Sequence, residues 1–202
     1  MPSDGRHWLD HIGSHSIVDK TIGRVSVRFI IEDTLSGCIH PCSVADVSHI
    51  LEQLSSSDWS GLKTFIFRQP TRKQLVLSPV WGRLQYYARP TTHAGKVLCE
   101  GPAIVLEAVE IGKPIVWRTS LGPDDAEELE RLREDGHLIN RVGKRHLIEV
   151  SANSARQTQL YRTLLHEIGH WFDWLSKVEE PSARGRFFYP RRTLFQATKV
   201  RA

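Results

Sequence analysis

The sequence is poor in cysteine and contains no long apolar run. Its 202 residues include three cysteines, Cys38, Cys42 and Cys99. An odd and sparse set of thiols argues against a disulfide framework and favours a reducing compartment. No stretch approaches the roughly 18 apolar residues that a membrane-spanning helix needs, and the polar N-terminus lacks the features of a signal peptide. We therefore expect a cytoplasmic protein that does not act in a membrane.

Basic residues are only slightly more numerous than acidic ones. The chain has 27 basic and 23 acidic residues, a formal net charge of +4. This excess permits contact with nucleic acid but does not require it. Between residues 181 and 202 there are six basic residues and no acid. Short basic segments of this kind are usually solvated, so a nucleic-acid or protein partner for this tail is the minor interpretation.

Residue periodicity predicts an α+β chain whose first half is rich in strands. Strands are expected over 21–31, 62–67, 103–109, 114–117, 137–142 and 146–150. Helices are expected over 43–54, 123–135 and 155–177, and a hairpin or bulge over 74–88. Ser43 is the expected N-cap of the first helix, and Ser154 with Gln157 forms a capping box for the last. The first fifteen residues show no period and are expected to form a loose arm.

The most informative segment runs from Leu164 to Asp173 and contains the pattern H-E-x-x-H. Residues four apart on a helix lie one turn above each other on the same face. The imidazoles of His166 and His170 can therefore bind one metal ion, at about 2.0–2.1 Å each if the ion is zinc. The carboxylate of Glu167 would lie beside that ion, where it can take a proton from water. The pattern predicts one zinc ion per chain with a general base beside it.

The helix that carries this pattern is amphipathic. Its apolar stripe consists of Leu160, Leu164, Ile168, Trp171 and Leu175. Two further apolar residues are expected to widen the stripe, Leu165 and Phe172. The opposite, polar face is predicted to hold His166, His170, Asp173, Gln159 and Thr163. Gly169 lies between the two faces, where we expect its small size to admit another backbone.

Residues 164–173 resemble the active-site helix of the zincin metallopeptidases, and more closely the gluzincin-like branch. The resemblance implies a zincin-like α+β fold, with a twisted mixed sheet and an H-E-x-x-H helix, and hydrolysis of peptide bonds in a peptide or protein substrate. By analogy with the family, the strand at 146–150 would line the substrate cleft. We expect residues 1–112 to form a strand-rich N-terminal region and residues 113–202 the zincin-like metal-binding region, together in one compact unit.

A catalytic zinc normally takes three protein ligands, and the third is not evident in this sequence. The candidates are Asp173, Glu179, Glu180, His146, Glu149 and Tyr189. For Asp173 we favour a role in which it does not bind the metal but accepts a hydrogen bond from an imidazole N–H and so orients that ring. A further hypothesis is that the chain ends before, or differs from, the segment that would carry this ligand. Zinc binding would then be weak and catalysis impaired.

A different class of function is the alternative interpretation. The protein would keep a zincin scaffold without catalysis and would bind nucleic acid or a protein partner through its basic tail. Glu167 discriminates between the two, because only a hydrolase needs it for turnover. The Cys38–Cys42 pair is not expected to hold a metal, since a structural zinc site needs four ligands and no second pair of cysteines follows.

Overall fold

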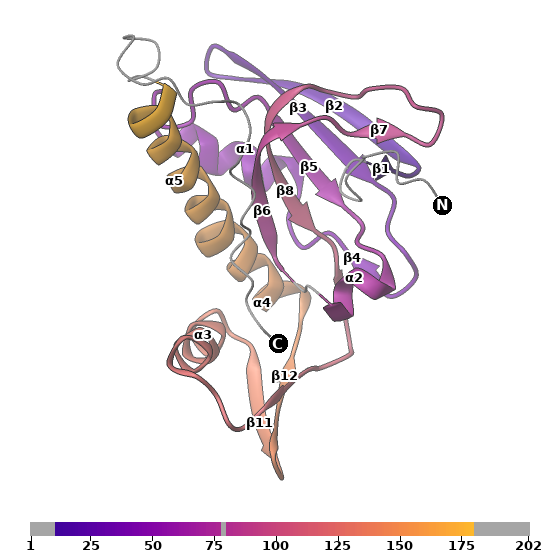
Figure 1. Ribbon diagram of the computed structural model, residues 1–202, viewed down its shortest axis with the longest axis vertical. Helices are drawn as coiled ribbons and strands as arrows, with labels where there is room; N and C mark the ends of the chain where they lie inside the picture. The colour runs from indigo at the N-terminus through magenta and orange to yellow at the C-terminus, as the bar shows by residue number, and fades with distance from the viewer. Residues whose placement is uncertain (1–10, 78–79, 180–202) are drawn as a thin grey trace.

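A mixed five-stranded sheet forms the centre of the protein in the computed structural model, which describes residues 11–77 and 80–179 (Figure 1). In spatial order its strands are β2 (His15–Ile22), β3 (Val25–Glu32), β5 (Thr64–Arg68), β8 (Gly101–Glu107) and β6 (Gly82–Ala88). The three central strands run parallel, whereas β2 and β6 are antiparallel edge strands. The expected α+β class with a twisted mixed sheet is thus confirmed.

Two helical segments pack against the same face of this sheet. One is α1 (Val44–Gln53), which Ser43 caps as expected. The other is a continuous helical run made of α4 (Ala152–Gln157), a π-helical segment (Thr158–Leu164), α5 (Leu165–Trp174) and a second π-helical segment (Leu175–Glu179). We call this run, residues 152–179, the long helix. Figure 1 shows it passing alongside the edge strand β6.

The main core lies between the sheet and these helices. Its largest fully buried side chains include Phe29, Phe65, Phe67 and Leu51, and the long helix adds Leu160, Leu164, Ile168 and Trp171. Burying each such side chain stabilises the fold by about 1.5–3 kcal/mol relative to leaving it in water. The long helix thus shares one core with a sheet built from residues before position 112.

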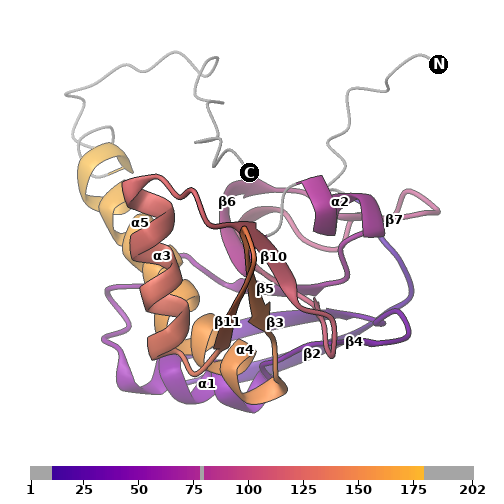
Figure 2. The same ribbon diagram turned by 90° about the horizontal axis from the view of Figure 1, so that it is seen from below.

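A smaller lobe lies at one end of the sheet (Figures 1 and 2). It contains the three-stranded antiparallel sheet β10 (Ile115–Arg118), β12 (Arg145–Glu149) and β11 (Leu138–Val142), together with helix α3 (Pro123–Glu134). Leu129, Leu132 and Ile148 form its core. Thr158 of the long helix ties the lobe in place, because its hydroxyl contacts both the buried imidazole of His137 and the carboxylate of Asp135.

The remaining elements are short. β1 (His11–Ile12) pairs in parallel with β7 (Thr91–Thr92), and β4 (Cys38–Ile39) pairs with β9 (Val109–Glu110). Helix α2 (Arg72–Leu77) precedes β6. Within the described ranges, no helix combines the length and apolar character that crossing a membrane would require.

Several sequence-based expectations were wrong in local detail. The stretch 21–31 is not one strand, because Gly23 adopts a φ of 60° and turns the chain between β2 and β3. Strand β2 begins at His15 and β1 at His11, so the expected loose arm is already structured there. The stretch 74–88 contains the end of α2 and the strand β6 instead of a hairpin, but the alternative of a bulge agrees with the irregular register of β6 against β8 between Gln85 and Ala88. The long helix begins three residues early, with Ser151 as N-cap and Ser154 completing the capping box.

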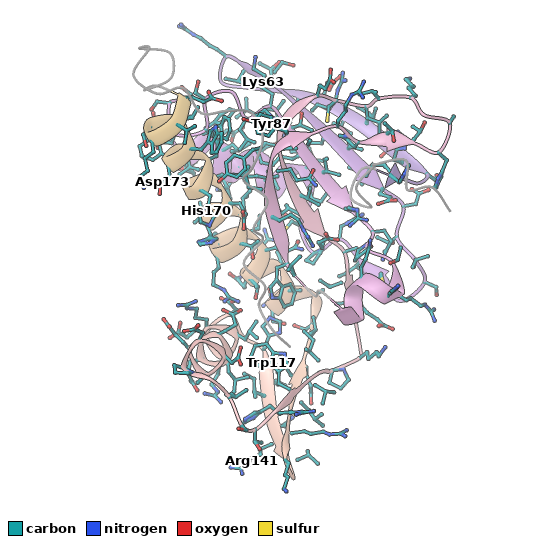
Figure 3. The ribbon with its side chains drawn as sticks, in the orientation of Figure 1. Lys63, Tyr87, Trp117, Arg141, His170 and Asp173 are labelled. Atoms are coloured by element: carbon teal, nitrogen blue, oxygen red, sulfur yellow. The ribbon has the colours of Figure 1, made fainter. Side chains whose placement is uncertain are left out.

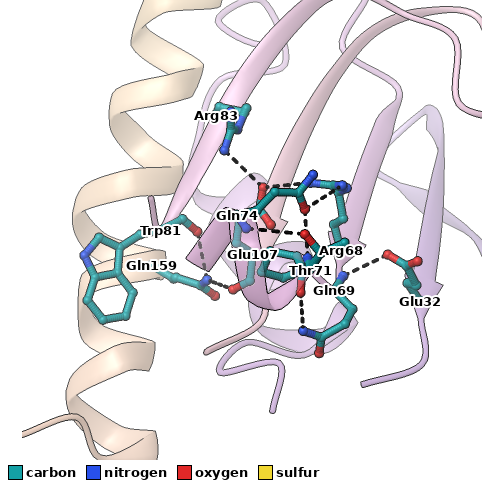
Figure 4. A network of polar contacts seen from close by, with 10 residues as sticks. Glu32, Arg68, Gln69, Thr71, Gln74, Trp81, Arg83, Glu107 and Gln159 are labelled. Carbon is teal, nitrogen blue, oxygen red and sulfur yellow. Dashed lines mark hydrogen bonds and ion pairs between the residues drawn. The ribbon is translucent and has the colours of Figure 1, made fainter. Parts of the chain in front are cut away.

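A buried ion cluster fixes the ends of the three strands nearest the long helix (Figure 4). The carboxylate of Glu107 on β8 lies 3.4 Å from Arg68 on β5 and 3.3 Å from Arg83 on β6. Burial raises the pKa of Glu107, and the two guanidinium groups oppose that rise. Next to this cluster the amide of Gln159 donates to the carbonyl oxygens of Trp81 and Glu107, at 2.8 and 2.5 Å.

We predict that Asp46→Asn lowers the free energy of unfolding by about 1 kcal/mol at neutral pH. Asp46 of α1 accepts a hydrogen bond from Arg156 of the long helix at 2.5 Å. This contact, with those from Ser43, lowers the pKa of Asp46 from 3.8 to about 2. Because the pKa in the folded state is the lower one, the stabilisation is complete above the unfolded value and disappears as the pH falls towards 2.

Urea unfolding of the parent protein and the variant across this pH range measures the effect of Asp46→Asn. Glu52→Gln, an exposed change on the same helix, is the matched control and should have little effect at any pH. A difference between parent and Asp46→Asn that persists unchanged at low pH would contradict the assignment.

Candidate functional site

Helix α5 presents His166 and His170 to solvent, one turn apart on one face. Their Nε2 atoms lie 2.8 Å apart, and the two rings meet edge to face with centroids 4.3 Å apart. At this distance one Nε2 carries a hydrogen and the other accepts it. The two Nε2 atoms, each a possible metal ligand, therefore lie next to each other at the surface of the helix.

Glu167 lies between the two imidazoles in sequence and faces the edge strand. Its Oε2 accepts a hydrogen bond of 2.8 Å from the backbone N–H of Leu84 on β6. The carboxylate is half-buried, whereas both imidazoles are exposed. The backbone of β6 thus fixes the position of the one acid in the motif.

Aromatic residues of β6 and α5 border the site. The rings of Tyr86 and Trp174 have centroids 4.4 Å apart, and Tyr87 meets Trp174 edge to face at 6.2 Å. Burial, followed by the negative charges of Glu167 and Asp173, raises the pKa of Tyr86. Tyr87 is 81% exposed, and Figure 3 shows it on the sheet side of α5. This arrangement offers an apolar surface next to the His pair.

Sequence reasoning assigned the wrong strand to this site. The strand expected to line the cleft, 146–150, is β12, the central strand of the small lobe. The strand beside α5 is β6, which supplies Leu84, Tyr86 and Tyr87. Tyr86 and Tyr87 were visible as an aromatic pair, but nothing in their spacing indicates which helix the strand meets.

The predicted phase of the long helix was partly correct. The stripe residues Leu160, Leu164, Ile168 and Trp171 are buried, whereas Leu165 and Phe172 are 37% and 48% exposed and do not widen the stripe. Gln159, expected on the polar face, is fully buried. It belongs to the π-helical segment Thr158–Leu164, whose wider turn shifts the faces away from a strict α-helical period.

The candidates for a third metal ligand do not gather around the His pair. The carboxylate of Asp173 accepts from Lys177 at 2.7 Å instead of orienting an imidazole. His146 and Glu149 lie on β12: His146 is opposite Trp117 and Arg141, and Glu149 accepts from Asn140. Trp117 and Arg141 lie in the small lobe, away from His170 (Figure 3).

Three further candidates lie at the end of the chain. Glu179 is exposed at the end of the long helix, and Glu180 and Tyr189 lie outside the described residues. Over 11–77 and 80–179, no three His, Cys, Asp or Glu side chains form a group that could hold a metal ion. The described residues thus bring together two imidazoles and one carboxylate at this site.

The cysteines contribute nothing to this site. Cys38, Cys42 and Cys99 are free thiols that come from other parts of the fold. Burial raises the pKa of the Cys42 thiol to about 12, so this thiol stays protonated at neutral pH.

Comparison with family models, with curated proteins and with solved structures finds no match to this chain. The functional argument therefore depends on the chemistry of the site. That chemistry comprises two convergent imidazoles, a carboxylate held by a strand backbone, and an aromatic border.

We predict that Gly82→Ala destabilises the protein by about 1–3 kcal/mol. A Cβ at this position would lie 2.7 Å from the carbonyl oxygen of Val105 and 3.0 Å from Cγ2 of Thr163. The neighbouring strand and the long helix would both have to move. The displacement should also loosen the contact between Leu84 and Glu167.

Gly169→Ala is the matched control for Gly82→Ala. The expectation that Gly169 admits another backbone was wrong, because a Cβ there would meet no atom within 4 Å. Alanine inside an exposed helix should therefore stabilise the protein by about 0.5–1 kcal/mol. Denaturant unfolding of both variants measures the two effects, and equal effects of the two substitutions would refute the close approach at Gly82.

Proposed function

We propose that the protein is a zinc-dependent metallopeptidase of the zincin type, gluzincin-like, that hydrolyses peptide bonds in a peptide or protein substrate. The observation that carries this proposal is the 2.8 Å approach of the Nε2 atoms of His166 and His170, with Glu167 next to them held by the Leu84 N–H. Three free cysteines suit a reducing compartment, and we place the activity in the cytoplasm.

The two imidazoles suit a zinc ion. Two ligands at about 2.0–2.1 Å in a tetrahedral arrangement are roughly 3.4 Å apart, so the pair needs to open by only about half an ångström from its hydrogen-bonded distance. Imidazole is also a preferred zinc ligand. We assign His166 and His170 as two ligands of one zinc per chain, and the third to Glu179, Glu180 or Tyr189, the candidates at the end of the long helix or beyond it.

A bound zinc would supply Lewis-acid polarisation of the scissile carbonyl and a lowered pKa of water. The chain itself supplies the proton transfers. Glu167 takes the proton from the attacking water and then delivers it to the leaving amine. Its hydrogen bond to Leu84 orients the carboxylate before substrate arrives, which reduces the entropic cost of aligning the base. The aromatic border of Tyr87 and Trp174 would hold an apolar side chain of the substrate.

The alternative function, a non-catalytic scaffold that binds partners through the basic tail, depends on residues outside the described ranges. Nothing in the geometry of α5 and β6 favours it. A protein without catalysis has no need for a carboxylate placed beside two convergent imidazoles.

We predict about one zinc ion per purified chain, lost in the double variant His166→Ala/His170→Ala. Metal content measured by inductively coupled plasma mass spectrometry checks this. His146→Ala is the control, and it should retain zinc because His146 lies in the small lobe. Glu179→Gln, Glu180→Gln and Tyr189→Phe, measured in parallel, identify the third ligand by the loss of zinc. A parent protein without zinc after supplementation would overturn the assignment.

We predict that Glu167→Gln keeps its zinc but loses at least about a hundredfold in turnover. Glutamine can still accept the Leu84 hydrogen bond but cannot take a proton from water. Release of fluorescent peptides from labelled casein, and from a mixed peptide library, measures the activity. Glu134→Gln on α3, which is exposed, should be fully active. Equal cleavage by the parent protein and Glu167→Gln, or no cleavage by the zinc-loaded parent, would count against a peptidase.

A further inference from the structure

The sheet of the small lobe has one covered and one open face. Side chains alternate between the two faces along each strand. Ile115, Trp117, Ile148 and Ile139 point towards α3, where Leu129 and Leu132 cover them. The other face carries Val116, Arg118, Leu147, Arg145 and Val142, together with Leu138, Asn140 and Glu149. None of the described helices packs on this second face, and Val116 and Val142 are 50% and 57% exposed.

Positive charges gather at one end of the open face. Arg118 of β10 is directly opposite Arg145 of β12 in the strand register. Lys144 lies next to Arg145 in the turn between β11 and β12, and its carbonyl accepts from the N–H of Thr119. This backbone hydrogen bond holds the residue after β10 next to the turn between β11 and β12. Two like charges directly opposite each other destabilise a sheet, so the arrangement has a cost that the fold itself does not explain.

These three cations border a hollow of about 350 Å³ that Thr119 and Ser120 complete. No ion pair joins Arg118, Lys144 or Arg145 to any acid among the described residues. The basic residues on the other side of the lobe differ. Arg131 and Arg133 of α3 pair with Glu127 and Glu130, and Arg162 pairs with Glu128 and Asp135. Most acids of the lobe thus lie on or next to α3, whereas Arg118, Lys144 and Arg145 gather at one end of the open face and Glu149, which accepts from Asn140, lies at its other end.

We propose that this hollow binds phosphate groups of duplex DNA, a function separate from the peptidase site. Arginine and lysine with hydroxyl groups and backbone N–H groups are the usual partners of backbone phosphates. Arg118, Ser120, Lys144 and Arg145 are all exposed, so the hollow opens at the surface, where the backbone of a polymer can reach it.

The open face favours a duplex over a single strand. Single-strand binding sites present aromatic platforms for stacking, and the one aromatic side chain of this sheet, Trp117, points to the covered face. The major groove of B-DNA is about 12 Å wide and open to protein side chains, whereas the major groove of A-form RNA is too narrow. The apolar Val116 and Val142 beside the cations can contact thymine methyl groups there.

The test is binding of a fluorescein-labelled DNA duplex of about 20 base pairs, two helical turns, to the full chain. Fluorescence anisotropy is recorded over a series of salt concentrations. Arg118→Gln/Arg145→Gln should weaken binding at least about tenfold near 0.1 M salt, and should reduce the slope of log K against log salt by about two. The matched control, Arg131→Gln/Arg133→Gln, removes the same two charges from the opposite side of the lobe and should leave both quantities nearly unchanged.

Four other measurements keep the proposal open to refutation. Arg118→Gln/Arg145→Gln should unfold at the same temperature as the parent protein or a higher one, because a like-charge pair has been removed, and it should retain its zinc. Arg191→Gln/Arg192→Gln reports on the basic tail. The proposal is overturned if the duplex does not bind, if both lobe variants weaken binding equally, or if only the tail variant does. Binding of polyglutamate that depends on Arg118 and Arg145, without duplex binding, would also overturn it and assign the hollow to an acidic protein.

Discussion

The long helix and the edge strand β6 can approach closely because position 82 carries no side chain. A Cβ there would collide with the neighbouring strand on one side and with Thr163 of the helix on the other. Two residues further along β6, the N–H of Leu84 meets the carboxylate of Glu167. The contact that positions the proposed base therefore depends on a missing side chain, and on the apolar stripe that holds the helix on the sheet.

The buried polar groups beneath this contact have a related role. Gln159 binds two carbonyl oxygens, those of Trp81 just before β6 and of Glu107 at the end of β8. Glu107 in turn lies between Arg68 and Arg83. Buried charges rarely add net stability compared with apolar side chains of the same shape, but removing one partner is costly. The cluster thus fixes where β5 and β8 end and where β6 begins its path along the helix.

Local sequence signals identified much of the fold. Ser43 correctly marked the start of α1, the acids after Pro123 marked α3, and the H-E-x-x-H spacing placed His166 and His170 on one helix face. These features depend on residues within a few positions of one another. The pairing of β6 with β8 joins residues 13 to 24 positions apart. The approach of β6 to α5 depends on contacts across 83 positions, such as Leu84 with Glu167. No local pattern contains that information, so the analogy with the family selected 146–150 instead.

Sequence periodicity also failed to predict which face of the long helix carries each side chain. A strict period of 3.6 residues puts Gln159 on the polar face, yet it is buried, because the turns from Thr158 to Leu164 are π-helical. A π-helical turn accommodates an extra residue relative to the α-helix. The π-helical segment therefore sets the direction in which the side chains of α5 point relative to the capped start of the long helix. Deleting a single residue from this segment would rotate α5 about the helix axis by about 100°. The carboxylate of Glu167 would then turn away from the N–H of Leu84 that holds it, although every residue of the motif would still be present.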